Sequence, residues 1–252
     1  MSASKTIVLI TGANGGIGYL TAQALITSSP NYHVIIGSRS LTKGETAVTE
    51  LQKTSPKSTV SVIQLDVTDE QSIANAAAQV EKEHGRLDVL INNAGIISHA
   101  QKLIDSLRET FETNTFGAAV TTEIFAPLLL KSKSPKLIYV TSELGSLAMR
   151  ADSTNTHYNL PATAYRMSKA AMNMLMLCDV QKYGGKGLKA WAFNPEYVVT
   201  NLSGTGEKGR EERIKNGAGD AAESARGIRE IVEGKRDGDA GKFIFKDGVH
   251  EW

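Results

Sequence analysis

The sequence predicts an α/β fold, a single doubly wound Rossmann-type domain whose seven-stranded, mostly parallel sheet carries helices on both faces. Short apolar runs alternate along the chain with longer segments of helical periodicity, the pattern of repeated β-α-β units. Most of these runs are continuous rather than alternating, as expected where helices cover both faces of a sheet. A glycine-rich turn follows the first run, as in the first β-α connection of such folds.

The individual elements follow in order from these patterns. Continuous apolar runs mark the strands, and apolar residues at helical spacing mark the helices. Two helices begin directly after a good N-cap residue, Asp69 or Asp220, whose side chain can accept from the free N–H groups of the first turn. The predicted strands are residues 6–10, 33–36, 60–65, 89–91, 137–140, 188–193 and 242–245, and the predicted helices are residues 16–27, 41–53, 70–83, 103–130, 162–183 and 221–233.

Composition and charge narrow the class of protein. At 252 residues, with 41% apolar and 22% charged residues, the chain fits one domain, residues 1–252. The formal net charge of +1 gives no reason to expect nucleic acid or an acidic membrane as a partner. No segment approaches the roughly 18 apolar residues of a membrane span, and we expect a cytoplasmic protein without a metal site. The single cysteine, Cys178, lies in an apolar stretch and is predicted to be buried.

The glycine-rich turn is the first candidate binding element. Gly12, Gly16 and Gly18 follow the first predicted strand and open a helix, with Asn14 and Ile17 between them. Glycine permits a tight turn, and the N–H groups of a helix N-terminus can then approach phosphate oxygens. Such a cluster can also be an ordinary strand-to-helix turn. Its position after the first strand favours a dinucleotide cofactor.

The end of the second predicted strand bears on the choice of cofactor. An NAD site commonly has Asp or Glu here for the ribose 2′-hydroxyl, whereas a 2′-phosphate calls for arginine. This chain has Ser38 and Arg39 and no carboxylate. A guanidinium with neighbouring hydroxyls can bind a phosphate. We therefore predict NADP(H) rather than NAD(H); the alternative is that Arg39 is only a solvated loop charge.

Two further loops follow successive strands. Asp66 and Val67 close the third strand, and the Asp66 carboxylate can accept from an adenine amino group. Asn93, Ala94 and Gly95 follow the fourth strand, where small residues permit close approach of backbone and ligand. Each signal alone also fits an ordinary turn. Together they lie at the edge where open α/β sheets bind ligands, and we predict that they contact the cofactor.

Tyr165 and Lys169 carry the strongest chemical signal. They are four residues apart on a predicted helix and therefore face the same way. A phenol has an ordinary pKa of about 10, and a nearby ammonium lowers that pKa by favouring phenolate. A tyrosine tuned in this way beside a dinucleotide predicts hydride transfer to or from a carbonyl.

Taken in order, these motifs make the chain resemble the short-chain dehydrogenase/reductase family over essentially its whole length. Within the family it most resembles the NADPH-dependent carbonyl reductases, through residues 41–44, 113–117, 241–243 and 251–252. The residues that carry the family resemblance are 11–18, 92–95, Asn114, Ser142, Tyr165, Lys169 and 195–200.

The resemblance implies a division of labour. Tyr165 would give the proton to the substrate oxygen, and Lys169 would lower its pKa and bond the nicotinamide ribose. Ser142 would hold the carbonyl oxygen, and Asn114 would join a proton relay through water to Lys169. The implied activity is reduction of an aldehyde, ketone or quinone by NADPH. The alternatives are an NAD-dependent alcohol dehydrogenase and a dinucleotide sensor without turnover.

The segment at residues 195–200 would lie beside the nicotinamide, with Pro195, Val198 and Thr200 as contacts. The sequence departs from the family here, because Glu196 stands where the family usually has glycine. A second departure is Gly15, where carbonyl reductases often have a basic residue, so that Arg39 remains the main basic determinant for NADP.

The stretch at residues 203–219 is rich in Gly, Glu, Lys and Arg and has few large apolar residues. It is interpreted either as a mobile loop over the substrate or as a disordered surface loop. Its place after the nicotinamide segment favours the mobile substrate loop. The expected ligand is a small carbonyl or alcohol; monomer, dimer and tetramer all remain open.

Overall fold

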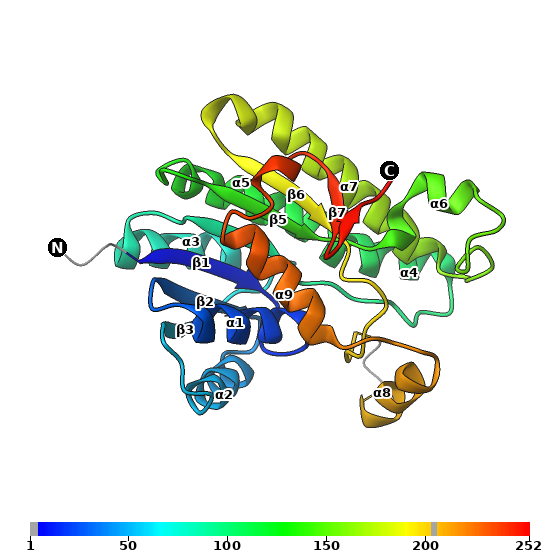
Figure 1. Cartoon of the computed structure of the whole chain (residues 1–252), viewed down its shortest axis with the longest axis horizontal. Helices are drawn as coiled ribbons and strands as arrows, with labels where there is room; N and C mark the ends of the chain where they lie inside the picture. Colours follow the sequence, from blue (N-terminus) through cyan, green and yellow to red (C-terminus); the bar gives the residue numbers. More distant parts are fainter. Residues whose placement is uncertain (1–4, 203–205) are drawn as a thin grey trace.

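The computed structural model describes residues 5–202 and 206–252. Within these ranges, eight strands form one sheet in the order β3-β2-β1-β4-β5-β6-β7-β8, parallel throughout except for the last pair (Figure 1). The strands are β1 Thr6–Thr11, β2 Tyr32–Ser38, β3 Thr59–Gln64, β4 Val89–Asn92, β5 Lys136–Val140, β6 Lys189–Phe193, β7 Phe243–Phe245 and β8 Gly248–Val249. The predicted fold class is confirmed, with the short antiparallel β8 added to the seven predicted strands.

Helices cover both faces of this sheet (Figure 1). Strand β1 lies between β2 and β4, so the strand order reverses there. At such a reversal the connections leave in opposite directions and open a crevice at the carboxyl ends of the strands. The α-helices are α1 Gly16–Ser28, α2 Leu41–Gln52, α3 Glu70–His84, α4 Leu103–Phe111, α5 Gly117–Leu129, α6 Leu147–Ala151, α7 Thr163–Tyr183, α8 Gly206–Lys215 and α9 Ala221–Val232.

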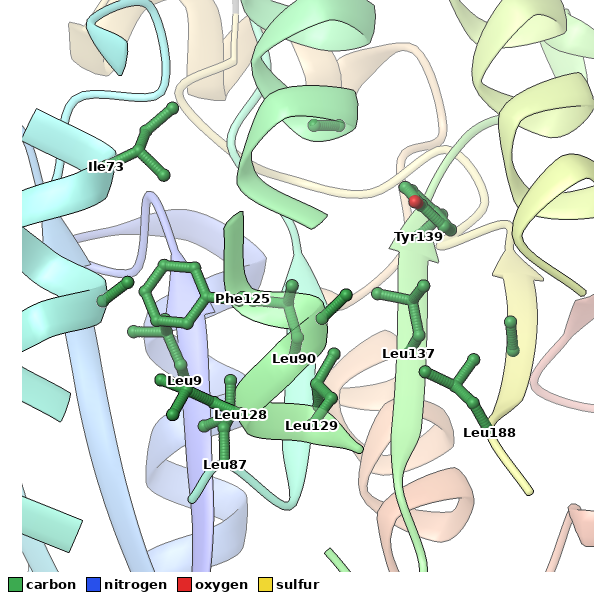
Figure 2. Packing of buried hydrophobic residues seen from close by; sticks show 14 of the residues in the cluster. Leu9, Ile73, Leu87, Leu90, Phe125, Leu128, Leu129, Leu137, Tyr139 and Leu188 are labelled. Atoms are coloured by element: carbon green, nitrogen blue, oxygen red, sulfur yellow. The ribbon is translucent and has the colours of Figure 1, made fainter. Parts of the chain in front are cut away.

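The continuous apolar strands serve two separate cores. Successive side chains of a strand point to opposite faces, so Leu9 enters one core while Val8 and Ile10 enter the other. The first core lies under α3, α5 and α7, and the second lies under α1, α2 and α9. Figure 2 shows part of the first core, in which Ile73 and Phe125 from the helices pack over the strands. The packed sheet therefore fixes the ends of its strands, from which the candidate site is built.

The predicted helix over residues 103–130 is instead two α-helices joined by a π-helical turn, Glu112–Phe116. The hydrophobic periodicity does not reveal this turn, because a π-turn adds a residue without interrupting the helical rod. A close contact accompanies it: a Cβ added to Gly117 would lie 2.7 Å from the Val67 carbonyl oxygen. The turn carries Asn114, one of the predicted site residues.

Two further expectations differ from the structure. The stretch at residues 203–219 contains α8, where no helix was predicted; residues 203–205 of that stretch lie outside the described residues. Cys178 is exposed, and the prediction that it is buried was wrong. The reason is that Met172 and Met176 occupy the buried face of α7, so Cys178 in the same apolar stretch faces outward.

In the described part of the chain, no helix has both the length and the apolar content to cross a membrane.

Candidate active site

The glycine-rich turn packs tightly against the loop after β4. Gly12 and Gly16 have φ values of 63° and 57°, in the left-handed region that favours glycine. A Cβ added to Gly12 would lie 2.9 Å from the Ala94 Cα, and one added to Gly18 would lie 2.5 Å from the Asn93 Nδ2. The turn and the loop after β4 thus form one unit, with room only for glycine at these contacts.

Thr11 joins these two loops, and the sequence analysis did not include it among the site residues. Its hydroxyl accepts from the backbone N–H groups of Asn93 at 3.0 Å and Ala94 at 2.9 Å. The Asn93 amide also donates to the Thr11 carbonyl oxygen at 2.8 Å. The position of a hydroxyl at the end of the first strand is the signal that could have identified Thr11.

The N-terminus of α1 lacks the side-chain cap that α2, α3 and α9 have. Ser40, Asp69 and Asp220 cap α2, α3 and α9 with their side chains. At α1 the N-cap is Gly15, which makes no side-chain hydrogen bond, and the first turn has no acidic residue. The first N–H groups and the positive end of the helix dipole are therefore free to bind an anion. With exposed Asn14 and half-buried Ile17 beside them, these residues fit the pyrophosphate of a dinucleotide.

At the end of β2, Arg39 is exposed, and its side chain makes no hydrogen bond or ion pair within the described ranges. Ser38 is buried, and its hydroxyl donates to the Ser40 carbonyl oxygen at 2.8 Å, so that proton is already used. Asp66 accepts from the Thr68 N–H at 3.0 Å and from its hydroxyl at 2.8 Å through one carboxylate oxygen. The guanidinium of Arg39 and the second oxygen of Asp66 are the groups available to an adenosine.

Tyr165 and Lys169 lie in the first two turns of α7 and are 8% and 3% exposed. The Lys169 Nζ lies 5.7 Å from the centroid of the Tyr165 ring and donates to the Val140 carbonyl oxygen at 2.9 Å. Ser142 begins the loop after β5, and its hydroxyl is hydrogen-bonded to that of Tyr165. The structure thus brings Ser142, Tyr165 and Lys169 together at the carboxyl end of β5.

Burial determines the protonation of this group. It raises the pKa of Tyr165 to about 12, against the lowering effects of the Ser142 hydrogen bond and of the positive charge on Arg213. Burial also lowers the pKa of Lys169 to about 7. The pKa of Tyr165 is therefore above its ordinary value here, because desolvation disfavours phenolate more than its neighbours favour it.

Asn114 lies in the π-helical turn and is fully buried. Its amide is held on both sides by Ile96: the Ile96 N–H donates to Oδ1 at 2.8 Å, and Nδ2 donates to the Ile96 carbonyl oxygen at 3.0 Å. Nδ2 also donates to the Ser168 hydroxyl at 3.1 Å. A Cβ added to Gly95 would lie 3.3 Å from the Asn114 Oδ1 and 3.6 Å from the Lys169 Nζ. Asn114 and Lys169 therefore flank one glycine.

The segment after β6 reaches the glycine-rich turn from the other side. Val198 pairs with Gly219 in an isolated parallel bridge, and the Pro195 carbonyl oxygen accepts from the Ser224 hydroxyl at 2.6 Å. A Cβ added to Gly16 would lie 4.0 Å from the Thr200 Cβ. Thr200 thus lies beside the N-terminus of α1, and Pro195 and Val198 in the same segment are held by Ser224 and Gly219.

Glu196 occupies a backbone conformation that suits glycine. Its φ is 64°, its N–H donates to the Asn194 Oδ1 at 2.9 Å, and its carboxylate lies 3.0 Å from the Lys246 Nζ. The departure from the family seen in the sequence therefore has a structural counterpart. The backbone at Glu196 has the left-handed conformation that glycine adopts easily, although this residue carries a side chain.

This strain predicts an order of stability for two substitutions. Glu196→Gly and Glu196→Ala both remove the ion pair with Lys246, but only glycine relieves the left-handed backbone. We expect the glycine variant to be more stable than the alanine variant by about 1 kcal/mol. Urea unfolding of both variants measures the difference; an alanine variant as stable as the glycine variant would show that the backbone at Glu196 is unstrained.

The fold and the site together define a class: a nucleotide-binding α/β protein whose crevice holds a buried Tyr–Lys pair. Residues 6–211 match the family model described as short chain dehydrogenase, and the chain belongs to the short-chain dehydrogenase/reductase family. The resemblance inferred from the sequence is confirmed. Members of this family are oxidoreductases that use NAD(P)H and act on small molecules.

Individual relatives are similar to this chain in sequence over nearly its whole length. The short-chain dehydrogenase/reductase tropE of Talaromyces stipitatus is 37% identical over 98% of this chain and 97% of its own length. Its counterpart eupG of a Phoma species is 35% identical over 98% of both chains. Among solved structures, the NADPH-bound carbonyl reductase from chicken fatty liver superposes with a TM-score of 0.81 at 29% identity, over 99% of this chain and 100% of that one.

Proposed function

We propose that this protein is an NADPH-dependent reductase of aldehydes, ketones or quinones in which Tyr165 is the general acid. The observation that carries the proposal is the group formed by half-buried Ser142 and buried Tyr165 and Lys169, at the sheet edge that also carries the uncapped N-terminus of α1. The likeness to an NADPH-bound carbonyl reductase supports it. The crevice uses residues from Gly12 to Thr200, which supports one catalytic domain over residues 1–252.

Each residue has a task that follows from its position. NADPH supplies the hydride when bound. The Tyr165 hydroxyl gives its proton to the substrate oxygen as the carbonyl carbon is reduced, and Ser142 bonds the same oxygen and orients it. Lys169 would bond the nicotinamide ribose of a bound cofactor. Asn114, fixed by Ile96, would connect Lys169 through water to a new proton.

The protonation state of Tyr165 suits a general acid. With a pKa of about 12, the hydroxyl keeps its proton at neutral pH and is ready to donate it.

Arg39 is proposed to bind the 2′-phosphate of NADP(H), while the backbone at Ser38 lies next to the ribose. Arg39→Ala should raise the Kd for NADPH by about 10- to 100-fold, the loss of a charge-assisted pair, and change the Kd for NADH by less than about twofold. Fluorescence titration measures both constants. Lys82→Ala, which removes an exposed charge near the end of α3, is the matched control. An equal loss for both cofactors would refute the assignment and favour an NAD-dependent dehydrogenase.

The activity itself is tested by adding purified protein to NADPH and a panel of aldehydes, ketones and quinones. We expect NADPH oxidation that depends on the carbonyl compound and yields the alcohol. Tight NADPH binding without reduction of any member of the panel would instead support a dinucleotide sensor.

A further inference from the structure

Helix α8 places one arginine beside the candidate site. In Figure 1, α8 and α6 lie on opposite sides of the carboxyl ends of the strands. Arg213, near the end of α8, turns back onto the nicotinamide segment. Its Nη1 donates to the Val198 carbonyl oxygen at 3.4 Å, and its guanidinium carbon lies 5.5 Å from the centroid of the Tyr197 ring. The side chain is half-buried between α8 and this segment.

The contacts of Arg213 leave most of its binding capacity unused. A donor–acceptor distance of 3.4 Å is at the long end for a hydrogen bond and engages one N–H group. Within the described ranges, no carboxylate lies within salt-bridge distance of Arg213. A half-buried guanidinium without a carboxylate is costly unless a partner arrives, because its charge is partly removed from water.

The nearby carboxylates already have partners of their own, and Asp220, which lines the same cavity, accepts from the Ala222 N–H at 2.9 Å as the N-cap of α9. Glu143, Glu196 and Glu223 line a cavity of about 330 Å³ beside Tyr197 and Val198. Glu143 lies 3.4 Å from the His157 ring, Glu196 lies 3.0 Å from the Lys246 ammonium, and Glu223 lies 2.8 Å from the Arg226 guanidinium. Among the residues that the structure describes, none of these carboxylates forms an ion pair with Arg213.

Arg213 also lies within electrostatic reach of the reacting group. Its charge is one of the two influences that lower the pKa of Tyr165, the other being the hydrogen bond from Ser142. A substrate that extends from Ser142 and Tyr165 to Tyr197 and Val198 would meet the Arg213 guanidinium there.

We propose that Arg213 is a specificity-determining residue that binds a carboxylate carried by the carbonyl substrate. The planar guanidinium suits a bidentate contact with a carboxylate. The Val198 carbonyl and the Tyr197 ring hold the guanidinium in place for it. This inference rests on the proposed function and adds the class of substrate: an oxo acid or a formyl acid rather than a neutral carbonyl.

The test compares 4-formylbenzoate with its neutral methyl ester as substrates for reduction by NADPH. For the native protein, we expect a higher kcat/KM with the acid than with the ester. Arg213→Gln should lower the ratio of the two kcat/KM values by about 10- to 100-fold, mainly through KM for the acid. Arg213→Lys should recover part of the ratio. Arg210→Gln, one turn earlier on α8 and exposed, should leave it unchanged.

A binding measurement separates this inference from the proposed function. The Kd of 4-(hydroxymethyl)benzoate, measured by calorimetry with NADP⁺ present, requires no turnover. If neither aldehyde is reduced, the proposed function fails, while a Kd that weakens about 10-fold or more in Arg213→Gln still supports the carboxylate contact. An unchanged acid-to-ester ratio, an unchanged Kd, or a selective loss of NADPH affinity in Arg213→Gln would overturn the role of Arg213.

Discussion

Replacing Tyr165 with phenylalanine should lower kcat for carbonyl reduction by at least ~100-fold, the usual cost of losing an acid–base group. The substitution removes the hydroxyl that Ser142 contacts and keeps the buried ring. NADPH affinity should change by less than about twofold, since the phenyl ring still fills the same space. Steady-state kinetics and a cofactor titration on the same preparation measure both quantities.

The pH dependence provides a second readout for Tyr165. Reduction needs the protonated hydroxyl, and the pKa of about 12 keeps it protonated over the whole neutral range. The part of kcat/KM that depends on Tyr165 should therefore be flat up to at least pH 9 and fall only in more alkaline solution. The matched control is Tyr183→Phe, at the far end of α7, which should keep activity. Full activity in Tyr165→Phe would remove this residue from the mechanism.

The second large effect is expected at Gly12. Gly12→Ala adds a Cβ that would lie 2.9 Å from the Ala94 Cα, at a φ of 63°. The strained backbone and the forced shift of the loop after β4 should together lower the free energy of unfolding by about 2–4 kcal/mol. Urea unfolding measures this loss, and a fluorescence titration should show at least about 10-fold weaker NADPH binding, because the phosphate cradle moves.

Gly15→Ala is the control for this experiment. Gly15 lies in the same turn, but its backbone is extended and an added Cβ meets nothing within 4 Å. We expect its stability to stay close to that of the native protein. If Gly12→Ala were as stable as Gly15→Ala, and bound NADPH equally well, the tight packing of the turn against Ala94 would have no energetic consequence.

Most of the fold could be predicted because the sequence expresses it locally. The runs that became β1, β2, β4, β5 and β6 are mostly apolar, since both faces of these strands are buried, whereas the edge strand β3 is only partly buried. The N-caps Asp69 and Asp220 start their helices where expected, and each side chain accepts from the second N–H of the helix. Strands and N-caps of this kind depend on a few residues that are neighbours in the sequence, so the sequence alone predicts them.

The features that were missed depend on contacts between distant segments. The π-helical turn at Asn114 has no signature in helical periodicity. Helix α8 contains almost no apolar residue, so its sequence resembles a loop. Arg213 lies on that helix, and only the folded structure shows that it contacts Val198 and Tyr197. The pairing of Tyr165 with Lys169 was predictable from spacing, but the dominance of burial over charge in their pKa values required the structure.

The central claim is that hydride passes from NADPH to a carbonyl carbon while Tyr165 protonates its oxygen. It is tested most directly with NADPH deuterated at C4 of the nicotinamide, using each of the two stereoisomers in turn with a reducible aldehyde. The account predicts that one isomer transfers its deuterium to the former carbonyl carbon of the alcohol and that Tyr165→Phe nearly abolishes this product. An alcohol without deuterium from either isomer, or no alcohol from any carbonyl despite tight NADPH binding, would contradict it.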